Sequence, residues 1–247
     1  MTLSQLDLKH IWHPCLQMKD YEDFPSIVIK SDKNVFLYDE NGKEYIDIIS
    51  SWWCNLLGHT NEQIIENIKA QLDTLEHVIF ANFTHELAIN LAMKLAEILL
   101  AGLVKFNFSD NGLAAVECVL KMAFWYHYQT IKLQKTRFMC LIDVYHGETI
   151  GALSVGAMDL YYKIYRPMLM DLMHTKALDC YRCEFGKCCE TCQAECFIYA
   201  KEAFTKFSDE TVAVIVEPLL QGGNYSSLLN LRIILMIIII LFMKENT

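Results

Sequence analysis

The stretch that decides the fold is FSDNGLAAVECVLKMAF, residues 108–124, together with the apolar run just before it. The pattern predicts a buried strand over 104–108, a tight turn over 109–112 and a helix over 113–129. An Asn-Gly turn at a helix N-terminus presents free backbone N–H groups and the positive end of the helix dipole, which suits a phosphate group. Such a connection is common in α/β proteins, so the turn alone does not decide between a phosphate site and an ordinary loop.

Further helices and strands alternate around this unit. Apolar runs over 138–142 and 211–216 are typical of buried strands, and a helical period covers 61–75 and 84–102. Thr84 is a good N-cap for the second of these helices. Helices that alternate with buried strands predict an α/β fold with a parallel or mostly parallel sheet.

The first fifty residues predict a meander of three short strands. The extended runs cover 26–29, 35–38 and 44–49, with turns over 31–34 and 39–42 between them. The sequence Ser-Ser-Trp-Trp follows over 50–53. In an extended backbone its two indole rings would point to opposite faces, so one could pack in the core while the other lines a cleft.

Composition and charge exclude several classes of protein. The 247 residues are 53% hydrophobic and 21% charged, with 21 basic and 30 acidic side chains and a formal net charge of −9. This composition excludes a disordered chain and a basic nucleic-acid-binding protein. The N-terminus has no basic region followed by an apolar run, so we expect no signal peptide, reduced thiols and a cytoplasmic protein.

Six of the ten cysteines lie close together in the sequence, at Cys180, Cys183, Cys188, Cys189, Cys192 and Cys196. Four of them form two C-x-x-C pairs, Cys180 with Cys183 and Cys189 with Cys192, the spacing at which two thiolates can reach one zinc ion. The pairs are closer to each other than in a zinc ribbon, and no histidine lies within the cluster. We therefore favour a reduced, Cys-rich insertion that holds no metal, with a zinc site as the alternative.

Polar and aromatic residues follow two of the predicted strands at the end where open α/β sheets bind ligands. Tyr145 and His146 could stack on a flat ring, and Glu148 could accept a proton. Glu217 could orient a ligand or pair with an arginine. The structural alternative for the aromatic loop is a cover for the core.

The order of these motifs resembles the class III, pyridoxal-phosphate-dependent aminotransferases over about residues 9–223. The segments that carry the resemblance are HIWHPCLQMKDYE (10–22), SSWW (50–53), LEHVIFANFTHELAI (75–89), FSDNGLAAVECVLKMAF (108–124), YHGETIGALSVG (145–156) and VIVEPLLQGG (214–223). HPC-x-QM with SSWW is similar to the branch that acts in biotin biosynthesis. That branch moves an amino group from S-adenosylmethionine to 8-amino-7-oxononanoate.

The resemblance implies a fold-type I α/β transferase that works as a homodimer on small molecules, with no nucleic-acid or membrane partner. It assigns residues 1–60 to the small domain and 61–223 to part of the large cofactor-binding domain, with 224–247 as a tail outside the family. For pyridoxal 5'-phosphate it implies a phosphate turn, a stacking ring with its neighbouring histidine and a strand-end glutamate, namely Gly112, Leu113, Tyr145, His146 and Glu217. For the substrate it implies contacts from Trp52, Trp53 and Tyr145.

Leu113 departs from the family pattern, in which this position is usually small or hydroxylic. A leucine keeps the backbone N–H, but it removes a hydroxyl donor and its bulk could crowd the turn. A hydrogen bond to a charged group is worth roughly 1.5–3 kcal/mol, so we expect weaker cofactor binding.

The tail NYSSLLNLRIILMIIIILFMKENT, residues 224–247, departs from the family altogether. Its apolar run over 233–243 is shorter than the about 20 residues that span a bilayer, and Asn230 and Arg232 precede it. A membrane anchor and a buried strand or helix are alternatives to the interpretation that we favour, a premature, out-of-register end.

The family's Schiff-base lysine and the aspartate that pairs with the pyridine nitrogen lie in its C-terminal half and have no match here. We therefore expect no catalytic residue in this chain, which the resemblance describes as truncated and inactive alone. The alternative is a non-catalytic module, Cys-rich and metal-binding or membrane-associated.

Overall fold

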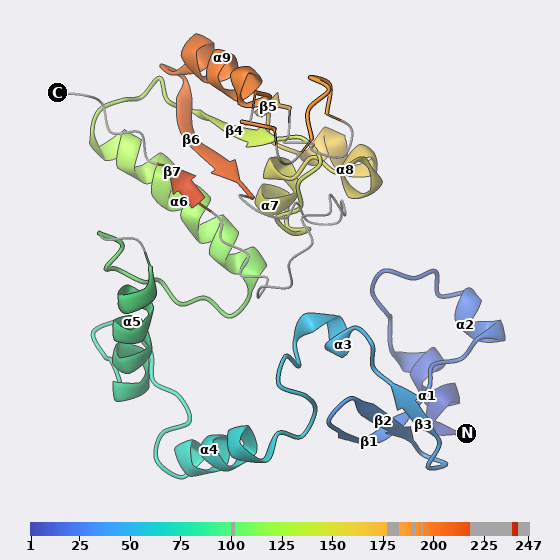
Figure 1. Cartoon of the computed structure of the whole chain (residues 1–247). Coiled ribbons are helices and arrows are strands. Elements are labelled where there is room, and N and C mark those ends of the chain that lie inside the picture. The colour runs from blue at the N-terminus through green and yellow to red at the C-terminus, as the bar shows by residue number, and fades with distance from the viewer. Residues whose placement is uncertain (100–101, 177–182, 189–190, 194, 218–238, 242–247) are drawn as a thin grey trace. The chain divides into compact units, whose positions relative to one another are not determined.

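The computed structural model describes residues 1–99, 102–176, 183–188, 191–193, 195–217 and 239–241 (Figure 1). The chain divides into two compact units, Met1–Val104 and Lys105–Thr247, each with its own sheet. The domain roles that the family resemblance gives to residues 1–60, 61–223 and 224–247 are a different kind of division and stay predictions.

The first unit contains a three-stranded antiparallel sheet in the order β1-β2-β3. Its strands are β1 (Ile29–Lys33), β2 (Phe36–Asp39) and β3 (Glu44–Ile46). The predicted meander is confirmed, but its first strand lies three residues later than predicted and its third strand is shorter. The first turn contains Asn34 with a φ of 56°, because asparagine tolerates the left-handed region better than most residues.

The helices of the first unit are α1 (Leu3–His10), α2 (Asp20–Asp23), α3 (Ser50–Trp53), α4 (Glu62–Leu72) and α5 (Glu86–Ile98). The two longest agree with the predicted periods. Asn61 caps α4, and its Oδ1 accepts from the N–H of Ile64 at 3.2 Å. His85 rather than Thr84 caps α5, so the cap of this helix lies one residue later than predicted. Neither helix has a buried residue, so their apolar stripes are exposed.

The second unit contains a four-stranded sheet in the order β5-β4-β6-β7. The strands β4 (Arg137–Leu141), β5 (Met173–Thr175) and β6 (Thr211–Val216) are parallel, and β7 (Ile239–Leu241) pairs antiparallel with β6. The predicted mostly parallel sheet is confirmed. Three residues of the apolar tail thus form an edge strand, and the rest of 224–247 lies outside the described residues.

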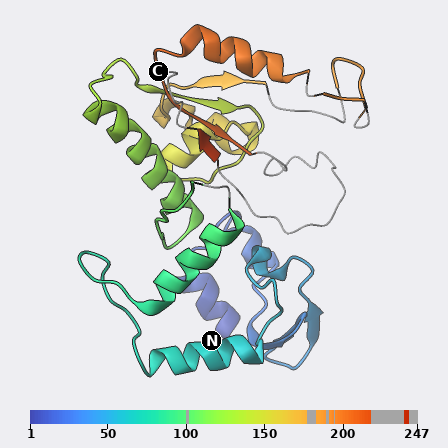
Figure 2. The same cartoon turned by 60° about the vertical axis from the view of Figure 1, so that its left-hand side comes forward.

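The helical elements of the second unit are α6 (Gly112–Gln129), α7 (Ile150–Val155), α8 (Asp159–Tyr165), the 3-10 turn η1 (Arg166–Met168) and α9 (Phe197–Phe207). Two views show the sheet between α9 on one side and α6 with α7 on the other (Figures 1 and 2). Among the described residues, no helix is both long enough and apolar enough to cross a membrane.

The core of the second unit lies between α6 and the sheet. Val116, Leu120 and Ala123 recur at helical spacing on the buried face of α6 and pack against β4 and β6. His127 extends this face and lies with Nε2 2.8 Å from the carbonyl oxygen of Val212. On β4, burial raises the pKa of the fully buried Cys140 thiol to about 12.

The strand predicted over 104–108 is not formed. Residues 103–109 have no strand assignment, and no described strand pairs with them. A β-strand is stable only when a neighbouring strand satisfies its N–H and C=O groups, so a suitable apolar run does not by itself form one.

Candidate active site

The N-terminus of α6 presents the N–H groups that the sequence predicts for a phosphate. Asn111 is the N-cap, and its Oδ1 accepts from the N–H of Ala114 at 2.8 Å. Within the described part of the chain, no acceptor takes a hydrogen bond from the N–H of Gly112 or Leu113. Two N–H groups therefore remain for an anion at the positive end of an 18-residue helix.

The side chain of Leu113 packs into the loop that carries the aromatic motif. Gly147 has a φ of 121°, and a Cβ at this position would overlap Leu113 Cδ2. The leucine also packs against the hydrophobic core of the unit. The Leu113 side chain therefore occupies the space that a side chain at Gly147 would need. Through this contact the predicted phosphate turn packs directly against the loop over 144–149.

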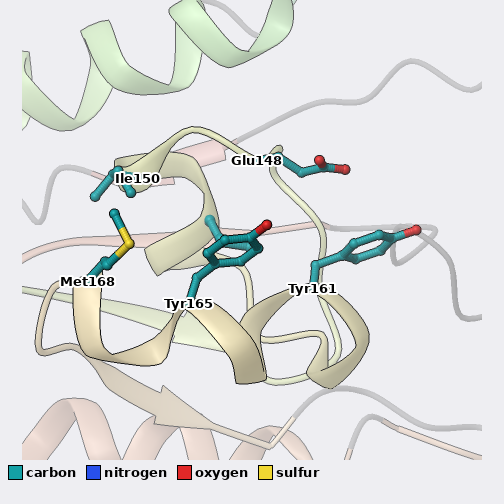
Figure 3. A pocket seen from close by; sticks show the side chains of 6 residues that line it. Glu148, Ile150, Tyr161, Tyr165 and Met168 are labelled. Atoms are coloured by element: carbon teal, nitrogen blue, oxygen red, sulfur yellow. The ribbon is translucent and has the colours of Figure 1, made fainter. Parts of the chain in front are cut away.

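Tyr145, in this loop, is half-buried and contacts two of the residues that line a small cavity. Its Oη donates to Glu148 Oε1 at 3.1 Å, and its ring centroid lies 5.6 Å from that of Tyr161. The cavity has a volume of about 240 Å³ and is lined by Glu148, Ile150, Leu153, Tyr161, Tyr165 and Met168. Figure 3 shows Tyr161 and Tyr165 rising from α8 beneath Glu148 and Ile150. The lining is apolar and aromatic, with one carboxylate at its edge.

His146 is a buried, neutral residue. Its side chain is 3% exposed, and neither ring nitrogen has a hydrogen-bond partner among the described residues. Burial lowers the pKa of His146 from 6.5 to about 4. The imidazole is therefore uncharged near pH 7.

This buried histidine makes the stability of the second unit sensitive to mild acid. Because the pKa of His146 is lower in the folded state, only the unfolded chain binds the proton between pH 6.5 and about 4. Its contribution is fully present above pH 6.5 and is lost as the pH falls, by up to about 3 kcal/mol. We expect the variant His146→Phe to lack this part of the pH dependence in urea unfolding. Equal pH dependence in both proteins would contradict the assignment.

Glu217 directly follows β6 and is 4% exposed. β4 and β6 are parallel neighbours with Cys140 opposite Ile215, so the loop that follows β4 and Glu217 leave the same edge of the sheet. The structure thus brings together the α6 N-terminus and the Tyr145 loop by direct packing, and it places Glu217 at their edge of the sheet.

Trp52 and Trp53 belong to the first unit, where the backbone differs from the predicted extended segment. Ser50, Ser51, Trp52 and Trp53 have φ values of 49°, 47°, 63° and 66°, so they form a left-handed turn. Both indole rings are exposed, at 63% and 70%. A left-handed conformation costs roughly 1–2 kcal/mol per residue, so contacts elsewhere must hold this turn.

A buried pair of side chains holds the turn. Asp47 Oδ2 accepts from Ser51 Oγ at 2.7 Å and lies 2.8 Å from His59 Nε2. The Asp47 and His59 side chains are 6% and 7% exposed. His59 Nδ1 lies 3.2 Å from Asn55 Nδ2 and 3.4 Å from Asp32 Oδ2. Hydrogen bonds from Ser51 and His59 lower the pKa of Asp47, so this carboxylate stays ionised in mild acid.

The cysteine cluster is described only in part, because Cys180 and Cys189 lie outside the described residues. Each C-x-x-C pair therefore has one partner that the structure does not place. Among the residues that it does place, no group of three or more His, Cys, Asp or Glu side chains is arranged to hold a metal ion. Cys192 Sγ lies 3.5 Å from Glu195 Oε2.

The cavity residues on α8 were not predicted from the sequence. Tyr161 and Tyr165 are four positions apart, so they lie on one face of a helix. This spacing is the sequence pattern from which an aromatic face could have been predicted. Glu117 was not predicted either. Its contacts with α7 depend on residues more than thirty positions away, which no local pattern shows.

Comparison with known proteins identifies the family. The model of the class III aminotransferases matches residues 17–226. The chain belongs to the class III aminotransferases. The chain is 39% identical over 224 residues to an adenosylmethionine-8-amino-7-oxononanoate aminotransferase of Geobacter sulfurreducens, covering 90% of this chain and 49% of the relative. A Helicobacter pylori protein of the same name is 41% identical over 228 residues, with the same two coverages.

A solved structure confirms the fold-type I architecture of this chain. The crystal structure of adenosylmethionine-8-amino-7-oxononanoate aminotransferase from Methanocaldococcus jannaschii matches with a TM-score of 0.76 and 33% identity. The match covers 86% of this chain and 45% of that chain. The chain therefore spans about half the length of the relatives it matches.

Proposed function

We propose that these residues form the cofactor-binding part of an aminotransferase of biotin biosynthesis. The amino group would move from S-adenosylmethionine to 8-amino-7-oxononanoate, and the cofactor would be pyridoxal 5'-phosphate. The observation that carries the proposal is the packing of Leu113 against Gly147, which sets two free N–H groups of α6 beside the Tyr145 loop. The names of relatives that are 39% and 41% identical support the substrate pair.

The described residues fit this cofactor. The N–H groups of Gly112 and Leu113 would bind its phosphate, and the Tyr145 ring would stack on its pyridine ring. The unpartnered nitrogens of His146 and the buried carboxylate of Glu217 would face it at the sheet edge. When bound, pyridoxal phosphate supplies an electron sink, and the protein supplies binding and orientation.

Several wider properties belong to the same proposal. We expect a cytoplasmic homodimer in which residues 1–60 contribute to the small domain and Trp52 and Trp53 contact the substrate. No position of these 247 residues matches the family's catalytic lysine. We therefore propose that they bind the cofactor without turning over substrate on their own.

The variant Leu113→Ser tests the phosphate site. A serine hydroxyl adds one donor to a charged phosphate, so we expect pyridoxal phosphate to bind about tenfold more tightly than to the wild type. Leu113→Ala is the matched control, since it also removes the leucine side chain but adds no donor. Equilibrium dialysis measures the three affinities. If all three proteins fail to bind at about 1 mM, the cofactor assignment is wrong.

A further inference from the structure

Glu117 lies in the second turn of α6, and its carboxylate binds the first turn of α7. Glu117 Oε1 accepts from Thr149 Oγ1 at 2.5 Å, from the N–H of Gly151 at 2.8 Å and from the N–H of Ala152 at 3.2 Å. Thr149 is the N-cap residue of α7, but its own side chain makes no capping bond. The carboxylate of another helix therefore replaces the cap oxygen, and its negative charge lies at the positive end of α7.

This contact leaves little freedom to the two helices. A Cβ on Gly151 would lie 2.8 Å from both Cδ and Oε1 of Glu117, so only glycine allows the carboxylate to approach this closely. Gly151 and the four residues that follow it in α7 are buried. The first turn of α7 is therefore fixed against α6 by hydrogen bonds and by close packing.

The loop between β4 and α7 carries Tyr145 and His146, and α6 holds it at two points. Leu113 packs against Gly147, and Glu117 binds Thr149 on the other side of the loop. We propose that Glu117 is a positioning residue, which sets the place of the Tyr145 ring relative to the N-terminus of α6. This inference rests on the proposed function, because that distance separates the ring-binding and phosphate-binding parts of the cofactor site.

A purely structural cap would have a different effect. It would change the free energy of unfolding, but the folded chain would bind pyridoxal phosphate with unchanged affinity. A positioning residue changes the affinity for the whole cofactor and leaves the affinity for inorganic phosphate unchanged, because phosphate needs only the N–H groups of α6.

The binding experiment uses Glu117→Ala and Glu117→Gln in the full 247-residue chain. We expect the alanine variant to bind pyridoxal phosphate about tenfold more weakly, within the range for residues coupled through one network. Glutamine keeps an acceptor oxygen, so it should recover most of this loss. Inorganic phosphate should bind all three proteins within about twofold. Equal loss of affinity for cofactor and phosphate would overturn the inference.

A double-mutant cycle with Tyr145→Ala tests the coupling directly. If Glu117 acts through the ring, Tyr145→Ala should weaken cofactor binding much less in the Glu117→Ala background than in the wild type. Additive losses would overturn the inference. Glu202→Gln, at an exposed position of α9, is the matched control and should leave every affinity unchanged.

Amide hydrogen exchange tests the same contact without cofactor. Glu117→Ala should speed exchange at the N–H groups of Gly151 and Ala152 by about tenfold, with α9 unchanged. If that variant does not fold, Glu117→Gln should give a smaller increase at the same two amides. Unchanged exchange there overturns the inference. A wild-type chain that exchanges as expected but binds no pyridoxal phosphate counts instead against the proposed function.

Discussion

Replacing Gly147 with alanine is expected to lower the free energy of unfolding of the second unit by about 4 kcal/mol, because two costs add. The φ of 121° at this position is one that residues with a Cβ rarely adopt. The new methyl group would also overlap Leu113 Cδ2, and Gly147 is itself buried. Urea unfolding followed by far-ultraviolet circular dichroism measures the change.

Gly186→Ala separates these two costs. Gly186 also has a positive φ, 64°, but nothing lies within 4 Å of its added Cβ. Gly186→Ala should therefore lower the free energy of unfolding by only about 1 kcal/mol, from the backbone conformation alone. Combining Gly147→Ala with Leu113→Ala should recover part of the steric loss. If Gly147→Ala proved no more costly than Gly186→Ala, the close packing of the phosphate turn against the aromatic loop would be refuted.

Asp47→Ala is expected to destabilise the first unit by about 3–5 kcal/mol, since it leaves His59 buried without its closest partner. The same change frees Ser51 and removes the support of the left-handed turn. Native-state amide hydrogen exchange measures the effect, because it reports the opening free energy of the first unit separately from that of the second.

Two comparisons make the Asp47 prediction specific. Ser51→Ala removes one hydrogen bond of the same carboxylate and should cost only about 1 kcal/mol. Protonation of Asp47 in acid should lower the stability of the first unit in the same way as Asp47→Ala does. Because the pKa of Asp47 is lowered in the folded state, its contribution is present above the ordinary carboxyl pKa and is lost as the pH falls through the folded value. Equal stability of wild type and Asp47→Ala near neutral pH would contradict the role of the pair.

The sequence predicts those elements whose stability comes from a face repeated along the element itself. The helix α6 begins within one residue of its predicted start, because an Asn-Gly turn and a buried stripe at helical spacing both mark it. β4 and β6 are likewise close to their predicted ranges, because both are buried and continuously apolar.

The sequence fails where distant contacts decide the backbone. The apolar run over 104–108 matches a strand pattern, yet no described strand pairs with it. The left-handed turn around Trp52 depends on Asp47 and His59, whose pairing no local period reveals. The same holds for the candidate site. Motif order identified Tyr145 and the phosphate turn, whereas the cap that Glu117 provides appears only once α6 and α7 are packed.

Alkylation of Cys140 reports how often the sheet of the second unit opens. Only a thiolate reacts with an alkylating reagent, and a fully buried thiol with a pKa of about 12 supplies almost none near neutral pH. Cys188, in contrast, is exposed, so it is accessible to reagent in the folded chain. Cys140 can therefore be alkylated only when β4 separates from the sheet. The rate of alkylation measures how often this sheet, on which the proposed cofactor site is built, opens.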